Sequence, residues 1–542
     1  MLNFAKPTTI VFFIFILSLN ACSSLPLIEI GSNTQRGTTI KLANGLVFYK
    51  VSKGGDRRIG SYILSSKLLA EGEAKKLNSQ LNSILSKGKY QKLIDTISII
   101  EPIENDPHGL SLGKLIQLGK FDSIEQAEII QRDLANSGVT LNISHTSLQG
   151  SQYGLFEISI LKLTPKNFQG QLISVLGNNK IATPETTSSM AHNKNAIAAV
   201  NAGFFVFDTK YGVVGDPAGI SVINGELISE AVAERPALLI KNFPQLSVHI
   251  LEGVKTKQTL IFEDEKVLIN GINRTIGKIL NCGQQTENKI IPAIHDHLCE
   301  STNEIVLYDD TFGELSMLKN AADFSFFIDK NNKIYGVNDK TKKSVPQGHY
   351  LIRSIGAKAK KLTTLIKAEQ RVKVDFKVVS KSGEVKLEKG MYIVNGGPTL
   401  LLEGKENIAI RPQEGWDTKA PLLGKSAVDS KDKIDHVGEH LTSRKQFYYN
   451  WVVRRHPRTA VGITQSGDVY IVVIYGRNPK ESVGASVTEM AKIMKSLNVD
   501  KAMNLDGGGS SVMIVDGKST GIPSDVEGER AVGDALLFLP SK

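Results

Sequence analysis

One stretch near the C-terminus combines groups that could bind phosphate with a carboxylate beside them. Residues 504–511 read Asn-Leu-Asp-Gly-Gly-Gly-Ser-Ser. Glycine lets a ligand approach the backbone closely, and consecutive backbone N–H groups can form a nest that holds an anion. The run therefore predicts a phosphate-binding loop with Asp506 at its start. Because glycine is also frequent in turns, a flexible turn is the alternative for this stretch.

Other segments share the design of an apolar strand that ends in small and polar residues. In three places such a strand delivers Asn or Asp just before glycine, at Asn201, Asn395 and Asp506. Each motif alone is weak, because Asn-Gly is also a common hairpin signal. Three of them in one domain, with Arg458 as a nearby cation, predict a polar pocket for a phosphorylated ligand.

Taken in order, these segments resemble the phosphodiester glycosidase family. The matching residues are Glu185-Thr-Thr-Ser188, Asn201-Ala-Gly-Phe-Phe205, Asn395-Gly-Gly-Pro398, Arg458-Thr-Ala-Val-Gly462, Asn504-Leu-Asp-Gly-Gly-Gly-Ser-Ser511 and Arg530-Ala-Val. The resemblance covers about 158 to 541 and implies a hydrolase of sugar-1-phosphodiesters, such as N-acetylglucosamine-1-phosphodiesters in envelope glycans or exopolysaccharides. One departure is Ala202, at a position where the family more often has glycine.

The chemistry of such a cleavage gives these residues roles. Breaking the bond at the anomeric carbon passes through an oxocarbenium-like state, so a carboxylate must stabilise the sugar cation or activate water. We predict Asp506 as that carboxylate and Arg458 as a charge-assisted ligand of the phosphate. Glu185 is a further catalytic candidate, and His456 is a secondary one. The predicted substrate-binding residues are Asn201, Gly203, Asn395, Gly396, Gly397, Thr459, Asn504, Gly507, Gly508, Gly509 and Ser510.

Each of these roles has a structural alternative. Asp506 could cap the glycine turn, Arg458 could form a structural salt bridge, and His456 could simply be exposed. The pocket residues lack the spacing of a metal site, so neither a metal nor a cofactor is predicted there. A non-catalytic envelope lipoprotein that binds glycan or phosphate in the same pocket is the alternative function.

The elements that position this pocket are predicted to be mostly strands. Beyond the first third of the chain, the composition favours strands separated by Gly, Asn and Pro turns. The clearest helix is 487–497, which has apolar residues in helical spacing, whereas 255–348 is only loosely patterned. We predict an α+β fold in which residues 158–542, with first strands from 22–58, form a β-rich catalytic domain.

Residues 59–157 predict a small insert of two βαβ units, which together give a ferredoxin-like sandwich. The second unit includes Ile116-Gln-Leu-Gly-Lys-Phe121 and Gln126-Ala-Glu128, and it resembles a SPOR repeat. This resemblance implies that the sheet face of the insert binds the glycan strands of peptidoglycan. An insert that serves only packing is the alternative.

The N-terminus predicts export. An apolar run at 10–19 follows Lys6 and is too short to span a bilayer, which is typical of a signal peptide. Leu19-Asn-Ala-Cys22 then resembles a bacterial lipoprotein signal. We therefore expect a signal peptide at 1–21 and a lipidated Cys22 that anchors the protein to a membrane of the cell envelope. A plain secretory signal is the alternative.

The charge balance favours acidic partners. The net charge is +10 and the pI is about 9.1, which suits phosphates, anionic glycans or a membrane surface. The basic residues are scattered and aromatic residues make up only 6% of the chain, so a nucleic-acid partner is not predicted.

Two cysteines remain besides Cys22. Cys282 and Cys299 form an isolated pair, which in an exported protein predicts a disulfide. His295 and His297 stand just before Cys299, so a zinc site is the alternative for this loop.

Overall fold

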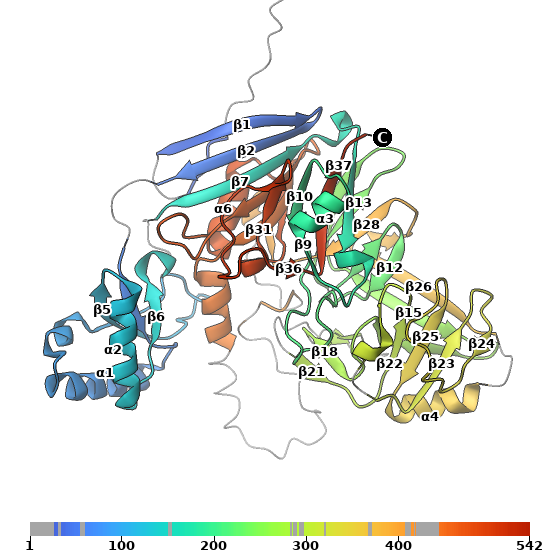
Figure 1. The fold of residues 1–542 in the computed structure, drawn as a ribbon, viewed down its shortest axis with the longest axis horizontal. Coiled ribbons are helices and arrows are strands. Elements are labelled where there is room, and N and C mark those ends of the chain that lie inside the picture. Colours follow the sequence, from blue (N-terminus) through green and yellow to red (C-terminus); the bar gives the residue numbers. More distant parts are fainter. Residues whose placement is uncertain are drawn as a thin grey trace, which may run out of the picture.

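The computed structural model describes residues 26–30, 34–54, 60–149, 154–232, 234–281, 284–285, 290–291, 298–318, 321–366, 371–406, 414–416, 418 and 444–541. Cys22, Cys282, His295 and His297 lie outside these ranges, as does the signal peptide predicted for 1–21. The described chain is rich in strands and has few helices, which confirms the β-rich α+β class (Figure 1).

An eight-stranded sheet forms the centre of the main domain, which comprises the described residues outside the insert and outside residues 255–385 (Figure 1). The strand order is β1 (Gln35–Ala43), β2 (Leu46–Lys53), β7 (Phe156–Leu163), β32 (Val469–Ile474), β31 (Arg458–Ile463), β33 (Lys501–Asn504), β29 (Thr399–Leu402) and β30 (Lys405–Glu406). Strand β2 precedes the insert and β7 follows it, yet the two pair antiparallel along their whole length. The insert therefore interrupts the main domain between two neighbouring strands.

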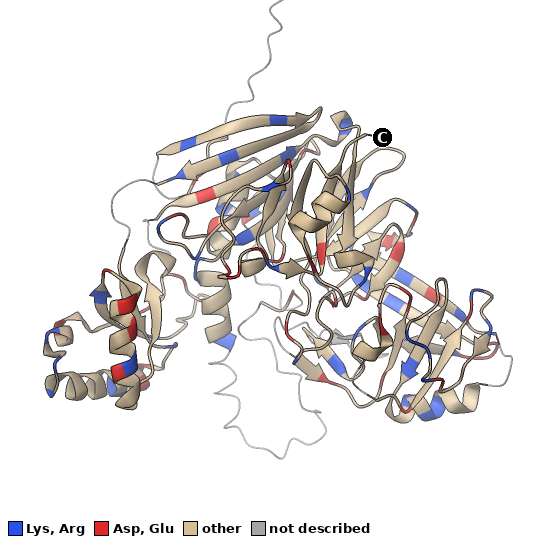
Figure 2. Cartoon of the chain, viewed as in Figure 1, with Lys and Arg blue, Asp and Glu red and all other residues tan. Residues whose placement is uncertain are grey.

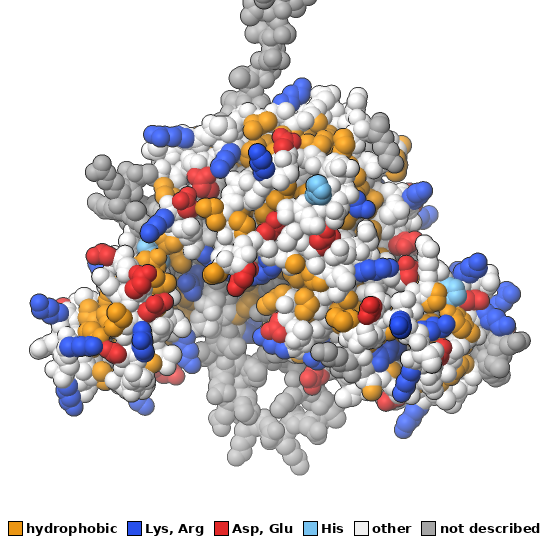
Figure 3. Space-filling model, in the orientation of Figure 1, with side chains coloured by type: hydrophobic (Ala, Val, Ile, Leu, Met, Phe, Trp, Pro, Cys, Tyr) orange, Lys and Arg blue, Asp and Glu red, His pale blue; other side chains and the backbone are white. Residues whose placement is uncertain are grey.

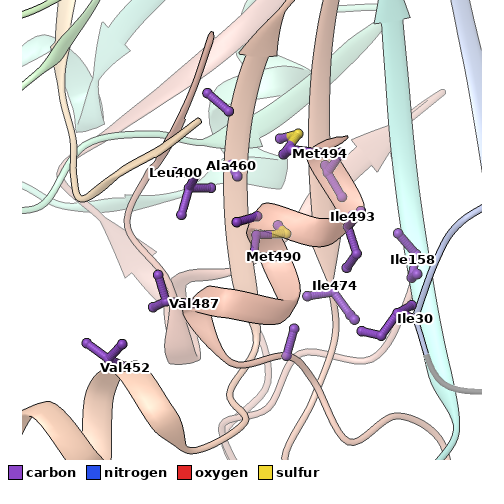
Figure 4. Packing of buried hydrophobic residues seen from close by; sticks show 14 of the residues in the cluster. Ile30, Ile158, Leu400, Val452, Ala460, Ile474, Val487, Met490, Ile493 and Met494 are labelled. Atoms are coloured by element: carbon purple, nitrogen blue, oxygen red, sulfur yellow. The ribbon is translucent and has the colours of Figure 1, made fainter. Parts of the chain in front are cut away.

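Alternating side chains give this sheet two apolar faces, as expected for strands that are covered on both sides. On one face, Ile158 and Ile474 pack with helix α6 (Val487–Ser496), whose Met490 and Ile493 are fully buried (Figure 4). Burial of each such side chain contributes about 1.5–3 kcal/mol. Helix α6 begins at Ser486, which forms a capping box with Glu489.

Two five-stranded sheets complete the main domain on the other face of the central sheet. The first has the order β35 (Lys518–Ser519), β34 (Met513–Val515), β10 (Ala198–Asn201), β37 (Asp534–Leu539) and β8 (Gln171–Leu176). The second has the order β12 (Glu226–Ser229), β11 (Ser221–Ile223), β28 (Met391–Asn395), β13 (Ala237–Lys241) and β14 (Ser247–Leu251). Val200, Val394 and Leu161 belong to one buried cluster that joins these sheets to the central one.

Residues 255–385 form an outer lobe beside the main domain (Figure 1). One sheet has the order β16 (Lys266–Ile269), β15 (Lys255–Ile261), β26 (Lys373–Ser380) and β27 (Gly383–Val385). The other has the order β17 (Gly271–Ile272), β22 (Ile305–Tyr308), β25 (Tyr350–Ser354), β23 (Phe324–Ile328) and β24 (Ile334–Tyr335), with helix α4 (Gly356–Leu365) against it. The loosely patterned sequence thus folds into ordered sheets.

Short elements connect these layers. Strands β9 (Glu185–Thr186) and β36 (Ala531–Val532) pair beside helix α3 (Thr187–Asn193). Two small hairpin-like pairs are β18 (Lys278–Leu280) with β21 (Leu298–Glu300), and β19 (Gln284–Gln285) with β20 (Ile290–Ile291). Cys299 lies in β21 and is disulfide-bonded, which favours the predicted disulfide over the zinc site.

The insert has the element order β3 (Tyr62–Ser65), α1 (Glu71–Ser86), β4 (Ser98–Ile100), β5 (Leu115–Phe121), α2 (Ile124–Asn136) and β6 (Asn142–His145). Its four strands are antiparallel in the order β4-β5-β3-β6, which is a β-α-β-β-α-β sandwich. Both helices pack on one face of this sheet. The likeness to SPOR repeats stays a prediction.

Charged side chains are distributed over all parts of the molecule (Figure 2). The space-filling view shows Lys, Arg, Asp and Glu interspersed on the visible face, with apolar side chains between them (Figure 3). Among the described residues, no helix is both long enough and apolar enough to cross a bilayer.

Candidate active site

A cavity of about 380 Å³ lies where the ends of β31, β32 and β33 meet the loop after β10 and residues 444–456. Its lining is partly polar and partly aromatic. The polar lining includes His456, Arg458, Arg477, Asp506, Gly507, Gly508, Gly509, Ser510 and Arg530; the aromatic lining is Phe204, Phe205, Phe207, Phe447 and Trp451. The structure therefore brings Asp506, the glycine run, Ser510 and Arg458 together at one cavity.

The glycine loop does not present its N–H groups as the sequence predicts. The N–H of Gly507 donates to Oδ1 of Asp506 (2.8 Å), and that of Gly508 donates to the carbonyl of Pro457 (2.9 Å). Both groups are used within the protein, so the predicted phosphate nest is wrong for these two residues. Gly508 has a φ of +63°, which glycine adopts without strain.

Two arginine side chains cover this loop instead. A Cβ atom at Gly508 would lie 3.0 Å from Nη2 of Arg477, and one at Gly509 would lie 2.2 Å from Nη2 of Arg530. The two guanidinium groups, and at Gly509 also the Asp525 carboxylate, occupy the space beside these glycines that side chains would fill. Arg477 has a φ of +61°, a conformation that costs about 1–3 kcal/mol in a non-glycine residue and is concentrated at functional sites.

Asp525 is the carboxylate that faces this arginine pair. Its Oδ2 accepts from Nε of Arg530 (2.7 Å), and its Oδ1 lies 4.0 Å from Nη1 of Arg477. Because one carboxylate faces two guanidinium groups, positive charge is left over beside the cavity. Guanidinium groups bind phosphate oxygens with charge-assisted, often bidentate hydrogen bonds. The arginine pair is therefore suited to an anionic ligand.

Asp506 contributes a carboxylate to the same cavity. Its backbone is held from both sides: its N–H donates to the carbonyl of Ala202 (3.0 Å), and its carbonyl accepts from Nδ2 of Asn201 (2.8 Å). Burial raises the pKa of Asp506 to about 6, although the Gly507 N–H partly opposes this shift. The carboxylate is thus mostly ionised at neutral pH and can change protonation state close to it.

Asp534 is a second buried carboxyl group near Asp506, and sequence reasoning missed it. It begins β37, is 3% exposed, and its Oδ1 accepts from the N–H of Gly203 (2.8 Å). Burial, with a further contribution from Asp506, raises the pKa of Asp534 to about 7. Asp534 does not line the cavity. An acidic residue at the start of an apolar strand, Gly-Asp-Ala-Leu-Leu-Phe, was the signal in the sequence.

Residues 325–539 match the sequence model of the phosphodiester glycosidase family. This range contains Asp506, the glycine loop and both arginines that cover it. This part of the chain is therefore similar to a phosphodiester glycosidase domain. The resemblance seen in the motifs is thereby confirmed.

Curated relatives match this chain over short stretches. The N-acetylglucosamine-1-phosphodiester alpha-N-acetylglucosaminidase of Mus musculus is 35% identical over 68 residues, which cover 12% of this chain and 13% of the mouse protein. The SPbeta prophage-derived uncharacterized protein YomE of Bacillus subtilis is 39% identical over 84 residues, covering 16% of this chain and 13% of YomE. The chain thus spans about one eighth of the length of these relatives.

A solved structure matches nearly the whole chain. The crystal structure of a Burkholderia pseudomallei protein, named as an exported protein, superposes with a TM-score of 0.81 at 26% identity. The match covers 95% of this chain and 99% of that one. The arrangement of main domain, outer lobe and insert is therefore shared with that Burkholderia pseudomallei protein.

Several residues predicted to bind substrate instead support the backbone of the family motifs. Oδ1 of Asn201 accepts from the hydroxyl of Thr459 (2.7 Å) and from the N–H of Val512 (3.2 Å). Asn201 and Thr459 are fully buried and do not line the cavity. Together with the bond from Asn201 to the Asp506 carbonyl, they fix the glycine loop to β10 and β31.

The Asn395-Gly-Gly motif supports the aromatic part of the cavity in the same way. Oδ1 of Asn395 accepts from the N–H of Phe204 (2.9 Å), so the carboxamide orients the loop that carries the aromatic lining. A Cβ at Gly203 would lie 2.6 Å from Nδ2 of Asn395, and one at Gly396 would lie 2.6 Å from the carbonyl of Asn504. Gly397, with a φ of +132°, lies against Trp416. The cavity lining does not include Gly203, Asn395, Gly396, Gly397 or Asn504.

Arg458 lines the cavity, but two of its nitrogens bind carbonyl groups. Its Nε donates to Ala485 (3.1 Å), and its Nη2 donates to Arg454 (3.3 Å) and to Trp451. Burial lowers the pKa of Arg458 to about 9. The guanidinium also lies 4.7 Å from the ring centroid of Trp451. Arg458 thus holds the backbone of Trp451, Arg454 and Ala485 in place beside the cavity.

Glu185 and His456 do not have the geometry of the acid and base that the sequence predicts. Glu185 lies outside the cavity lining, where its carboxylate accepts from Ser189 and Asn193 at the start and end of α3. His456 lines the cavity with both ring nitrogens engaged: Nδ1 accepts from Arg477 (3.2 Å), so Nε2 carries the proton and donates to the Asn450 carbonyl (2.6 Å). Burial and the nearby arginines hold its pKa well below the usual range, so a neutral His456 positions Arg477.

Asp534→Asn should stabilise the protein at alkaline pH. The folded pKa of about 7 lies above the ordinary value of 3.8, so the folded chain retains a proton that the unfolded chain releases. The wild type therefore loses stability as the pH rises from about 4 to about 7, whereas the variant does not. Urea unfolding should show the variant to be more stable by up to about 4 kcal/mol at about pH 8, with no gain near pH 4. If the wild type and the variant were equally stable at both pH values, the raised pKa assigned to Asp534 would be contradicted.

Proposed function

We propose that the protein hydrolyses sugar-1-phosphodiesters, with esters like N-acetylglucosamine-1-phosphodiester in envelope glycans or exopolysaccharides as the substrate class. The observation that carries this proposal is the arginine pair, Arg477 and Arg530, over the glycine loop in the cavity that also holds Asp506. The match of residues 325–539 to the sequence model of the phosphodiester glycosidase family supports it. The mouse relative is named for cleavage of such an ester.

The arginine pair and Asp506 act on different parts of the substrate. Arg477 and Arg530 bind the phosphate and neutralise the charge that grows on it as the bond to the sugar breaks. Asp506, largely ionised at neutral pH, stabilises the sugar cation or accepts a proton from the attacking water. The hydroxyl of the water ends on the sugar, and the phosphate leaves as a monoester. Because phosphate is a good leaving group, this scheme needs no strong acid, which agrees with the neutral, doubly engaged His456.

We further propose that the protein is located in the bacterial cell envelope. The apolar run before Cys22 and the signal-like Leu-Asn-Ala-Cys motif support export with lipidation of Cys22. The Burkholderia pseudomallei protein that shares the fold is named as an exported protein. Mass spectrometry of the membrane fraction should identify a lipidated Cys22 peptide, and a Cys22→Ala variant should lose membrane attachment.

Incubation of the purified chain with an N-acetylglucosamine-1-phosphodiester tests the activity directly. Release of free sugar and a phosphate monoester in equal amounts is the expected result. The same reaction in isotopically labelled water should place the label on the sugar, because the bond at the anomeric carbon is the one that breaks. Saturable binding without any product would instead indicate a binding protein that keeps only the pocket.

A further inference from the structure

The two faces of the insert's sheet have different neighbours. Leu118, on β5, belongs to the cluster that packs beneath α1 and α2. Leu115, on the same strand but on the opposite face, belongs to the cluster that contains Tyr448 and Val452 of the main domain. Ser144 of β6 shares this second face, since it accepts a hydrogen bond from Nη2 of Arg454 (3.2 Å). The face without helices therefore packs against residues 444–456.

Hydrogen bonds from the insert hold this segment at both of its ends. Near its start, Oε1 of Gln446 accepts from the N–H of Leu68 (2.6 Å). Near its end, Nη1 of Arg455 donates to the carbonyl of Ser147 (2.9 Å), and its backbone N–H donates to the carbonyl of Leu148 (3.0 Å). Arg455 is 2% exposed and also binds Glu489, the capping residue of α6.

The same segment is a wall of the active-site cavity. Phe447, Trp451 and His456 all line the cavity, and the Trp451 ring stacks on Trp416 with 4.2 Å between centroids. His456 directly follows Arg455 and accepts a hydrogen bond from Arg477. A continuous set of contacts therefore leads from the insert through Arg455 and His456 to the arginine pair.

We propose that the insert is a positioning element of the active site. Its helix-free sheet face holds residues 444–456 against the cavity and thereby sets the position of Arg477 and the affinity for an anionic ligand. The resemblance to SPOR repeats assigned this face to glycan strands, but here protein covers it. The proposal concerns the architecture of the cavity and does not depend on which phosphodiester is cleaved.

Leu115→Ala and Leu118→Ala provide a matched test in the full chain. Both residues are almost completely buried leucines on β5, so both substitutions remove a similar amount of buried apolar surface. The chain has two tryptophans, and because Trp451 lies in the wall and Trp416 stacks on it, intrinsic fluorescence reports on the wall directly. Leu115→Ala should shift the emission to longer wavelength and weaken the binding of inorganic phosphate several-fold. Leu118→Ala should leave both unchanged.

The measurement distinguishes this inference from the proposed reaction, because neither emission nor phosphate affinity requires turnover. Where activity is measurable, Leu115→Ala should raise KM with a smaller effect on kcat. Identical emission and phosphate affinity in the two variants would overturn the proposal. A second result would also overturn it. Gln117 lies on the covered face. If the wild type bound peptidoglycan sacculi and Gln117→Ala did not, that face would be open to glycan.

Discussion

Asp506→Asn is expected to abolish hydrolysis of a sugar-1-phosphodiester, with kcat lowered by about 10²- to 10⁴-fold. The substitution keeps Oδ1, which accepts the N–H of Gly507, so the turn that carries the residue retains its hydrogen bond. What is lost is the negative charge that stabilises the sugar cation or takes a proton from water. Initial rates on an N-acetylglucosamine-1-phosphodiester measure the effect.

The pH dependence of the same reaction gives an independent readout of Asp506. Since its pKa is raised to about 6, activity should fall as the pH drops below this value and the carboxylate becomes protonated. Asp534→Asn is the matched control, because it makes the same chemical change at a carboxyl group that does not line the cavity. That variant should stay active and keep the acidic limb near the same pH, since Asp534, with a pKa of about 7, is already mostly protonated where Asp506 titrates. Full activity of Asp506→Asn would exclude Asp506 from the mechanism.

The part of the site that a contiguous run of residues encodes could be predicted from the sequence. Asp506 and the three glycines after it lie at the cavity, because their spacing along the chain is also their spacing in the loop. The reason for the glycines was nevertheless wrong. They make room for Arg477 and Arg530, and that requirement appears only when distant segments are brought together.

Residues that stand outside a motif could not be found in this way. Arg477 follows the end of β32 in a short turn, and only its left-handed backbone and its position over Gly508 mark it as functional. Asn201 and Asn395 were correctly placed at strand ends, but the sequence does not say which way a carboxamide points. Both point into the protein, where they bind backbone groups that shape the cavity.

The insert shows the same division between local and long-range information. Its strands and helices follow from hydrophobic periodicity, and the structure has them in a β-α-β-β-α-β order. Nothing in that periodicity shows that the second sheet face packs on the main domain, since buried side chains give the same pattern whichever partner covers them. Leu115 reads as a core residue in both cases.

Arg477→Gln and Arg530→Gln are each expected to weaken binding of inorganic phosphate, and of the substrate, by about ten- to hundred-fold. A hydrogen bond to a charged group contributes about 1.5–3 kcal/mol, and about 1.4 kcal/mol corresponds to a factor of ten. Titration calorimetry with inorganic phosphate measures this without any need for turnover. Arg132→Gln, at an exposed position on α2, is the control and should bind phosphate as the wild type does.

The Asp525→Asn variant tests whether Arg477 and Arg530 bind an anion or only form a structural salt bridge with Asp525. The Asp525 carboxylate lies against Arg530 and near Arg477, so a phosphate must share these guanidinium groups with it. If the pair binds substrate, removal of the competing charge should tighten phosphate binding, whereas removal of an arginine weakens it. If the three residues only stabilise the loop, all three variants should lower the melting temperature and none should bind phosphate more tightly. Opposite signs for the carboxylate and arginine variants therefore identify the pair as the group that receives the phosphate.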